Sequence, residues 1–313
     1  MTAAVERGVL ILGGPTASGK SSVAVALAER YGAEIVGADS RQIYRDMPIG
    51  TAAPTAEQQA RVAHHLIGFL DPYERYSAAR FAADALGTIA EIHARGKRAI
   101  VAGGTGFYLR ALCGEVELAA EPDPALRERV RLEAHIHPSD VLHAWLRARN
   151  PARAALISER DPYRIVRALE IELARERRAI APAVGAPRGG RSLRASGIAY
   201  VKVGLRVDPA ELGARIARRT DAMLAGGLLA EAERVGASAI AADAVGYREA
   251  LAYLDGRLTG GELRTVLVRA TRRYAKRQLT WFRTEPGVVW LEAGDFAAAD
   301  MAVSGIGWTP LRS

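Results

Sequence analysis

The residues with the clearest chemical meaning lie near the N-terminus of this 313-residue chain. The stretch Gly14-Pro15-Thr16-Ala17-Ser18-Gly19-Lys20-Ser21 satisfies the pattern GxxxxGK[ST]. Its glycines let successive backbone N–H groups turn toward a phosphate, Lys20 supplies a positive charge, and the Ser21 hydroxyl can ligate Mg²⁺. Val9–Leu12 directly before it predicts a buried strand, and Lys20–Tyr31 predicts a helix. We therefore expect a binding site for a diphosphate-type ligand.

Two further polar residues follow predicted strands. Asp39 comes after Glu34–Ala38, and Thr105 lies in a GGTG turn after Arg98–Ala102. The carboxyl ends of parallel strands face the ligand crevice of such sheets, so both side chains are candidates for the site. Asp39 could bind a metal or accept a proton, or it could cap the next turn. The loop pattern alone does not identify the phosphate compound, and ATP is the default.

These residues need a scaffold of alternating strands and helices. Short apolar runs alternate with helix-length segments in the first third of the chain, where Leu66–Phe69 is a further candidate strand and Ser77–Arg95 a helix. That alternation predicts a parallel sheet covered by helices. Later, Ile198–Arg206 returns to a strand pattern. We expect an α/β fold with a P-loop NTPase-like parallel core in two segments, 1–118 and 199–313.

The segment 119–198 has a different pattern. Strand-like runs are missing there, while Asp123-Pro124 and Asp161-Pro162 each read as a helix N-cap followed by proline. The Gly/Pro-rich stretch 181–190 resembles a linker. We therefore expect an inserted all-helical domain. In the core, Asp208-Pro209 should begin a helix ending near Met223, and Thr259 with Glu262 should form a capping box.

Composition excludes several classes of protein. With 49% hydrophobic and 25% charged residues, the chain is not disordered, and no apolar run approaches the ~20 residues of a membrane-spanning helix. The charged residues just before the first strand are unlike a secretory signal. The single cysteine, Cys113, cannot form an intramolecular disulfide or a Cys-based zinc site. His64-His65 and His135-x-His137 lack the acids of a metal site. A globular, cytoplasmic, monomeric protein is expected.

The net charge of +8 is concentrated in two stretches. The range 264–283 holds seven cations and no acid, and 119–197 holds fifteen arginines against ten acids. On a helical projection of the first range the apolar residues share one side, and the other side carries a basic stripe. A solvated helix face usually has mixed charge, so the stripe points to a polyanion. The apolar residues are Leu263, Leu267, Ala270, Tyr274 and Trp281, and the basic stripe is Arg269, Arg272, Arg273, Lys276 and Arg283.

Taken together, the motifs resemble one family, the tRNA dimethylallyltransferases, over nearly the whole chain. The family usually has Lys where this chain has Ala53 and Asp where it has Gly68. The zinc finger of eukaryotic relatives is missing, which indicates a bacterial type. The motifs are GPTASGKS (14–21), ADSRQIYRDMPIGTAAP (38–54), HHLIGFLDPYERYSAARF (64–81), VAGGTGFYLRAL (101–112), DPYRIVRALE (161–170), RIARRTDAMLAGGL (215–228), VGYRE (245–249) and RRYAKRQLTWFR (272–283).

The resemblance implies transfer of a dimethylallyl group from dimethylallyl diphosphate to N6 of the adenosine just 3′ of the tRNA anticodon. The loop 14–21 would then hold the departing diphosphate, with Mg²⁺ at Ser21 as the cofactor. Lys20 and Arg219 would neutralise its charge, Asp39 would accept the proton of the amine, and Thr105 would hydrogen-bond that amine. The adenine would have to leave its stack to enter this site.

Most of the expected tRNA contacts are implied by the resemblance, because their positions match contact regions of the family. Arg272 is added from the basic stripe, and Thr105 from its proposed hydrogen bond to the amine. The contacts in the insertion would make it a tRNA-binding domain. The residues are Asp39, Ser40, Arg41, Gln42, Thr105, Arg127, Tyr163, Arg164, Arg167, Asp243, Gly246, Tyr247, Arg248, Arg272, Lys276, Arg277, Gln278 and Arg283.

Two other functions compete with this interpretation. An ATP-dependent small-molecule kinase would use the phosphate loop and the α/β core but leave the basic stripe without a role. A non-catalytic RNA-binding protein would use the charge but leave Lys20, Asp39 and Thr105 unexplained. The prenyltransferase accounts for both sets of residues.

Overall fold

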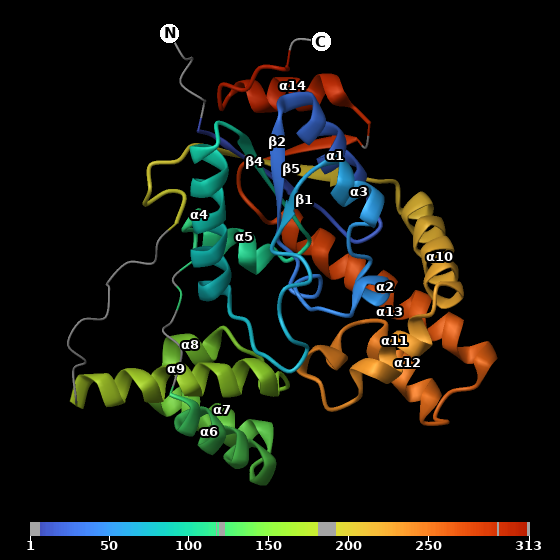
Figure 1. Cartoon of the computed structure of the whole chain (residues 1–313). Coiled ribbons are helices and arrows are strands. Elements are labelled where there is room, and N and C mark those ends of the chain that lie inside the picture. The colour runs from blue at the N-terminus through green and yellow to red at the C-terminus, as the bar shows by residue number, and fades with distance from the viewer. Residues whose placement is uncertain (1–6, 117, 119–122, 181–191, 293, 312–313) are drawn as a thin grey trace. The chain divides into compact units, whose positions relative to one another are not determined.

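The computed structural model describes residues 7–116, 118, 123–180, 192–292 and 294–311. It divides into two compact units, which we call the core unit (Met1–Val116 with Arg191–Ser313) and the helical unit (Glu117–Gly190). Figure 1 labels their elements. No helix among the described residues combines the length and the apolarity that crossing a membrane requires.

A six-stranded sheet forms the centre of the core unit. Its strands are β1 (Val9–Gly13), β2 (Ala33–Gly37), β3 (His64–His65), β4 (Arg98–Ala102), β5 (Tyr200–Arg206) and β6 (Val288–Glu292). They lie in the order β3-β2-β4-β1-β5-β6, and every pair is parallel. Every residue of β1 and β2 is buried, as expected for strands covered on both faces. The predicted P-loop-like parallel sheet is therefore confirmed.

Helices pack on the faces of the sheet. Apolar residues of α1 (Lys20–Tyr31) and α14 (Phe296–Ser304) share one cluster with Leu10, Leu12 and Ile100 of the sheet. On the other side of the strands lies α4 (Ala78–Ala94), which packs against α5 (Gly106–Cys113), as Figure 1 shows. The short α3 (Ala56–Arg61) begins at Thr55 with a capping box to Gln58.

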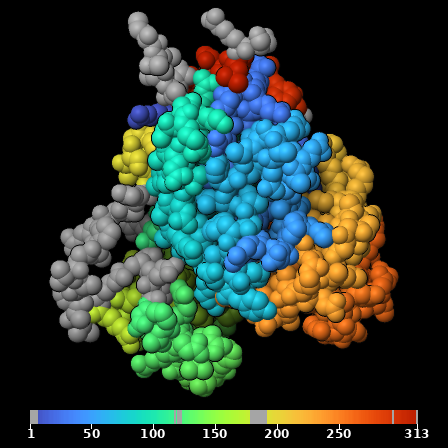
Figure 2. Space-filling view, viewed as in Figure 1, coloured from blue at the N-terminus to red at the C-terminus, as the bar shows by residue number. Residues whose placement is uncertain are grey.

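A second apolar cluster of the core unit joins segments far apart in the sequence. Ile43, Tyr44 and Met47 pack with Leu228 and Leu267. On the surface of the core unit, an early part of the chain (blue) adjoins a later part (orange), as Figure 2 shows. The elements around this cluster are α2 (Pro48–Thr51), α10 (Pro209–Ala225), α11 (Leu228–Val235), the 3-10 turn η1 (Ile240–Asp243), α12 (Tyr247–Leu254) and α13 (Gly260–Arg283). The cluster fixes the segment that follows Asp39 against the helices that carry Arg219 and the basic stripe.

The helical unit contains α6 (Pro124–Ile136), α7 (Ser139–Arg149), α8 (Pro151–Ala155) and α9 (Pro162–Ile180). Asp123 caps α6 by accepting from the Ala125 N–H at 3.0 Å, and Asp161 accepts from the Arg164 N–H at 3.1 Å, so both predicted N-caps are confirmed. Leucine and isoleucine side chains from the helices form a separate small core.

Two predictions of local structure are wrong. The third strand is His64–His65 and not Leu66–Phe69, because Leu66 (φ 57°) and Gly68 (φ 60°) adopt left-handed backbone conformations that end the strand. Residues 192–198, which we assigned to the insertion, belong to the core unit. There the Leu193 N–H donates to the Leu112 carbonyl at 2.8 Å, and Leu193 is fully buried. The predicted linker 181–190 lies outside the described residues.

Candidate active site

Three neighbouring strands bring the predicted reactive residues to one edge of the sheet. The phosphate loop 14–19 follows β1, Asp39 lies two residues beyond β2, and Thr105 lies three residues beyond β4. Since β2, β4 and β1 are adjacent and parallel, their carboxyl ends meet at the same edge. A Cβ on Gly103 would come within 2.0 Å of the Ala38 carbonyl oxygen, so the close approach of the β2 and β4 ends requires glycine.

The phosphate loop has the backbone expected of an anion cradle. Gly14, Ala17 and Gly19 have positive φ angles of 143°, 64° and 92°, and α1 begins directly after Gly19. The N–H groups of the first turn of α1 lack helical partners and can face a ligand. Lys20 Nζ donates to the Pro15 carbonyl at 2.6 Å, which folds its side chain back over the loop.

The loop lines a cavity of about 420 Å³ together with Asp39, Gln42 and Arg219. Burial lowers the pKa of Lys20 to about 8; the negative charge of Asp39 acts against this shift, and the positive charge of Arg219 adds to it. Burial also lowers the pKa of Arg219. Two desolvated cations beside one loop would attract a diphosphate strongly.

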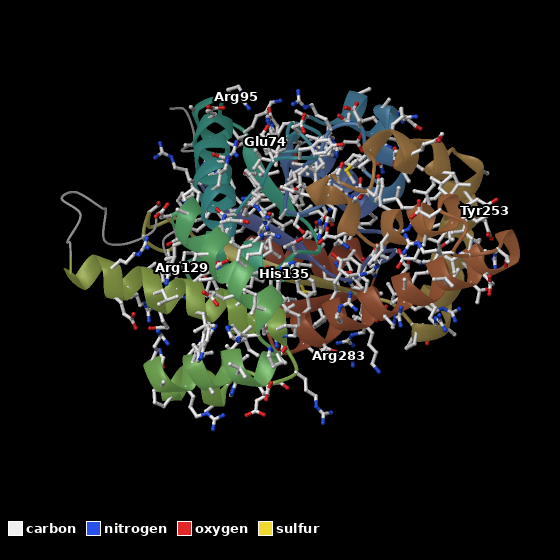
Figure 3. The ribbon with its side chains drawn as sticks, turned by 90° about the horizontal axis from the view of Figure 1, so that it is seen from below. Glu74, Arg95, Arg129, His135, Tyr253 and Arg283 are labelled. Carbon is white, nitrogen blue, oxygen red and sulfur yellow. The ribbon has the colours of Figure 1, made fainter. Side chains whose placement is uncertain are left out.

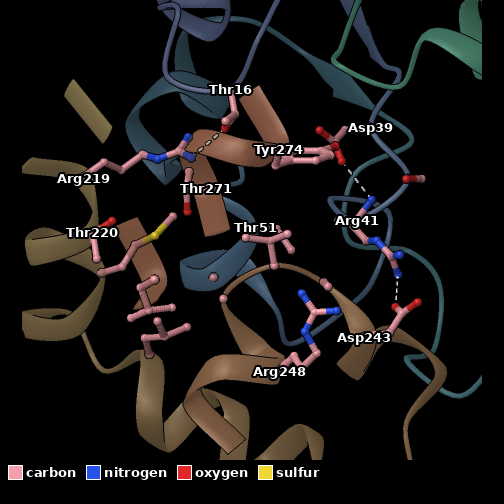
Figure 4. A pocket seen from close by; sticks show the side chains of 18 of the residues that line it. Thr16, Asp39, Arg41, Thr51, Arg219, Thr220, Asp243, Arg248, Thr271 and Tyr274 are labelled. Carbon is pink, nitrogen blue, oxygen red and sulfur yellow. Dashed lines mark hydrogen bonds and ion pairs between the residues drawn. The ribbon is translucent and has the colours of Figure 1, made fainter. Parts of the chain in front are cut away.

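Arg219 reaches the phosphate loop from α10. Its Nη2 donates to the Thr16 hydroxyl at 2.6 Å, as the dashed line in Figure 4 shows. A second cavity, of about 240 Å³, lies on the other side of this contact. Thr16, Asp39, Thr51 and Arg219 line both cavities, which therefore adjoin. The first has the residues for a diphosphate, and the second combines polar groups with the apolar side chains of Met223, Leu228 and Leu267.

Asp39 lies where the two cavities meet. Its Oδ1 accepts from the Arg41 N–H at 2.9 Å, and among the described residues Oδ2 has no hydrogen-bond partner. The Ser40 N–H donates to Thr105 Oγ1 at 2.9 Å, and Thr105 Oγ1 lies 3.3 Å from Ser40 Oγ, so Thr105 fixes the backbone beside Asp39. Tyr274 lines the second cavity near Asp39 (Figure 4), and burial, with the charge of Asp39, raises the pKa of its phenol.

A magnesium ion fits the donors of this site. Ser21 lines the phosphate cavity and offers its hydroxyl as a ligand. Mg²⁺ is commonly held by one or two protein groups with substrate phosphates and water completing its shell. Among the described residues no three His, Cys, Asp or Glu side chains gather as a metal site. The metal would therefore depend on the phosphates, and it would supply charge neutralisation to them.

Several predicted tRNA contacts of the core unit line the second cavity. Arg41 Nη1 and Asp243 Oδ1 form an ion pair at 2.6 Å, shown in Figure 4. Arg248, whose side chain is 63% exposed, also lines this cavity, as do Ser40, Gly246 and Arg277. The Gln42 amide instead donates to the carbonyls of Thr51 and Ala52 at 3.1 and 2.9 Å. It shapes the wall of the phosphate cavity.

Two predicted tRNA contacts are buried, which corrects the sequence interpretation. Tyr247 is 0% exposed, and its hydroxyl donates to Glu231 at 2.5 Å. Gln278 is 6% exposed and uses its amide inside the core unit. Neither side chain is accessible to an RNA. Both lie in segments where exposed and buried residues alternate. A contact region assigned to the whole segment therefore does not tell which of its side chains are exposed.

The basic stripe lies on the outer face of α13. Arg269, Arg272, Arg273, Lys276 and Arg283 are exposed, and Figure 3 shows Arg283 at the C-terminal end of the helix. Among the described residues none of the five forms an ion pair with an acid. Leu263, Leu267 and Ala270 are buried on the opposite face, as predicted. Tyr274, on the apolar side of the projection, lines the second cavity.

The predicted contacts of the helical unit differ in exposure. Tyr163 is 81% exposed, and the Arg164 side chain is 72% exposed while it lies 3.5 Å from Asp161. Arg167 Nη1 pairs with Glu170 at 2.7 Å, and Arg127 lies 3.9 Å from the same carboxylate. Tyr163 and Arg164 therefore present free surface, and Arg127 and Arg167 are partly neutralised.

Sequence reasoning missed other residues of the site. Arg215, one turn before Arg219 on α10, donates to the Ser18 carbonyl at 3.2 Å. The i, i+4 spacing of the two arginines within RIARR could have indicated both. Thr51 and Thr271 line the second cavity without a recognisable pattern. Buried Glu231 was also missed; it accepts from the Ile49 and Gly50 N–H groups at 2.9 and 2.7 Å and holds α2 in place.

Comparisons with known proteins agree with this arrangement. The family model described as IPP transferase matches residues 42–285, and that described as isopentenyl transferase matches residues 7–67. A tRNA dimethylallyltransferase of Anaeromyxobacter dehalogenans is 48% identical over 90% of this chain and 94% of its own, and one of Bordetella parapertussis is 43% identical over 93% and 95%.

Solved structures give the same result. The tRNA isopentenylpyrophosphate transferase of Bacillus halodurans superimposes with a TM-score of 0.68 at 35% identity, covering 96% of each chain. A eukaryotic dimethylallyltransferase acting on tRNA, at 24% identity and a TM-score of 0.74, shares the fold over 96% of this chain and 77% of its own. The family models and the relatives together show that the chain belongs to the IPP transferase family.

Proposed function

We propose that this protein transfers the dimethylallyl group of dimethylallyl diphosphate to N6 of the adenosine 3′-adjacent to the tRNA anticodon, releasing diphosphate. One observation carries the proposal: Asp39 lies between a cationic phosphate cavity and a second cavity that is part polar and part apolar. A base at that junction can act on an amine that attacks a diphosphate ester. The relatives are named tRNA dimethylallyltransferase, which supports the donor group and the tRNA acceptor.

The donor side of the reaction needs a stabilised leaving group. When the C–O bond to the diphosphate breaks, the electron pair stays on the diphosphate oxygen, and negative charge develops there. Lys20, Arg219 and the phosphate loop line the cavity that we assign to the diphosphate, so they would face this charge. Fixed donors in a desolvated site stabilise such charge more than water does.

The acceptor side needs a base. The exocyclic amine of adenine is a poor nucleophile and loses a proton as its C–N bond to the prenyl carbon forms. Asp39 has one oxygen held by the Arg41 N–H and the other free, so it can take that proton without leaving its position. Thr105 accepts a hydrogen bond from the Ser40 N–H and so keeps the backbone beside Asp39 in place.

The tRNA would bind through exposed cations and an exposed tyrosine. The stripe on α13 offers Arg272, Lys276 and Arg283 to phosphates, and the helical unit offers Tyr163 and Arg164. We assign tRNA contact to both units on this basis. A monomer acting in the cytoplasm, with Mg²⁺ accompanying the diphosphate, completes the proposal.

The test is an incubation of purified protein with Mg²⁺, an unmodified tRNA transcript and dimethylallyl diphosphate, followed by digestion and mass spectrometry of the nucleosides. A second tube contains ATP instead of the prenyl donor, and a third uses a transcript with guanosine at the acceptor position. We expect prenylated adenosine in the first tube alone. ATP turnover without a modified nucleoside would favour a kinase and contradict the proposal.

A further inference from the structure

Gln278 joins two loops of the site from the inner face of α13. Its Oε1 accepts from the Thr16 N–H at 2.8 Å, and its Nε2 donates to the Gly104 carbonyl at 3.0 Å. The side chain is 6% exposed. Both hydrogen-bonding groups of the amide are therefore satisfied by backbone groups of loops that lie 262 and 174 positions away.

Each of these loops holds a different part of the proposed reaction. Thr16 belongs to the phosphate loop, and its hydroxyl accepts from Arg219. Gly104 precedes Thr105, whose N–H donates to the Ala38 carbonyl at 3.2 Å and whose hydroxyl accepts from the Ser40 N–H. Ala38 and Ser40 flank Asp39. Hydrogen bonds and the peptide links between neighbouring residues thus connect the phosphate loop through Gln278 to Asp39.

Glutamine is the side chain that this position requires. It must offer an acceptor to one backbone N–H and a donor to one backbone carbonyl, and a glutamate anion offers acceptors only. A Cβ on Gly104 would lie 2.2 Å from Gln278 Nε2, so Gly104 leaves the space into which the amide fits. A buried amide with both partners present resists rotation, since either broken bond leaves an unsatisfied group.

We propose that Gln278 is a positioning residue of the transfer reaction, which sets the spacing between the diphosphate loop and Asp39 and makes no contact with tRNA. The inference rests on the proposed function. Displacing reacting groups by about 1 Å can lower a rate about 100-fold, so this spacing is expected to appear in kcat.

The experiment compares Gln278→Met and Gln278→Glu with the wild-type chain. Gln278→Met keeps the shape of the side chain and removes both hydrogen bonds. We expect its kcat to fall by about 10- to 100-fold, its affinity for inorganic diphosphate to weaken, and its tRNA Kd to stay at the wild-type value. Gln59→Met, the same change at an exposed position of α3 that lines neither cavity, is the matched control and should leave kcat and both affinities unchanged.

The Gln278→Glu variant tests the positioning role through the pH dependence of its kcat, which a purely structural role would not change. A protonated carboxyl can accept from the Thr16 N–H and donate to the Gly104 carbonyl, whereas the carboxylate can only accept. The ratio of its kcat to that of wild type should therefore rise as the pH is lowered from about 8 to about 6, toward the range where carboxyls protonate. Melting curves of all variants show whether each is folded.

Two results would overturn the inference. A raised tRNA Kd with wild-type kcat at saturating tRNA would make Gln278 a tRNA contact, and a lowered Tm with unchanged kcat would make it a structural residue only. Failure of the proposed function is recognised separately, because the wild-type chain would then yield no prenylated nucleoside. In that case the diphosphate affinities of the variants still report whether Gln278 positions the loop.

Discussion

Arg219 of α10 donates a hydrogen bond to the hydroxyl of Thr16 at 2.6 Å, although 203 positions separate them in the chain. The contact holds a buried guanidinium at the wall shared by the two cavities. Arg219→Lys keeps the charge but loses the planar set of donors, so we expect kcat to fall by about 100-fold or more. The exposed neighbour Arg218→Lys is the control. Equal effects of the two substitutions on single-turnover rates would contradict this role.

Asp39→Asn should nearly abolish transfer. The amide keeps the shape of the side chain and can still accept from the Arg41 N–H, but it cannot take a proton from the amine. We expect the rate to fall by about 100- to 10,000-fold, with tRNA affinity measured by filter binding unchanged. Turnover close to wild type would remove Asp39 as the base.

Lys20 should lose its proton at a lower pH than an ordinary lysine. The chain has only four lysines, Lys20, Lys97, Lys202 and Lys276, so ¹³C-lysine NMR can resolve each ε-carbon. We expect the midpoint of Lys20 near pH 8 in the free protein, because burial disfavours its charged form. Bound diphosphate should raise that midpoint, since it stabilises the ammonium.

Lys202 is the internal reference for that titration. Burial disfavours its ammonium too, but hydrogen bonds to Glu115 and Glu285 outweigh burial and raise its pKa. The midpoint of its ε-carbon titration should therefore lie at a higher pH than that of Lys20. Coincident midpoints for the two residues would show that the desolvation of Lys20 is not maintained in solution.

The basic stripe should control the salt dependence of tRNA binding. Reversing the charge at Arg272 and Lys276 to Glu removes two exposed cations from α13. Each lost phosphate contact should flatten the slope of log Kd against log salt by roughly 0.7 to 0.9. The same double reversal at Arg206 and Arg234, exposed on other elements, is the control. An unchanged slope in the α13 variant would mean that the stripe does not touch RNA.

Glu231 should matter for stability as well as for the site. Its buried carboxylate accepts from the Ile49 and Gly50 N–H groups and from Tyr247. Glu231→Ala therefore leaves both N–H groups without this acceptor and the Tyr247 hydroxyl with the Met47 carbonyl at 3.1 Å. We expect urea denaturation to show a loss of about 3 kcal/mol in the free energy of unfolding. Glu233→Ala, exposed on the same helix, should change it by about 0.5 kcal/mol or less.

The sequence predicts elements well where local chemistry decides them. Lys20–Tyr31 and Arg98–Ala102 have the predicted bounds, and the predicted caps at Asp208 and Thr259 are confirmed, because periodicity and capping act within a few residues. The strand at Leu66–Phe69 was predicted from its apolar residues alone, whereas the observed chain turns through a positive φ there. Apolar composition does not encode that turn.

The site was predictable only in part, for a related reason. Lys20, Asp39 and Thr105 follow strands, and the sheet rule brings strand ends together. Gln278 and Tyr247 were misassigned because burial depends on packing between helices that are distant in the sequence. Their segments match the motifs of the family, but tertiary contacts decide whether each side chain within a motif is buried or exposed.

The hydrogen bond between the Leu193 N–H and the Leu112 carbonyl has an evolutionary consequence. Both residues belong to the core unit, so this unit itself brings the two ends of the intervening segment together. Insertions, deletions and exchanges within 117–190 can then accumulate without shifting the register of any strand. A lineage can thus alter the helical unit while inheriting the sheet edge of the core unit unchanged.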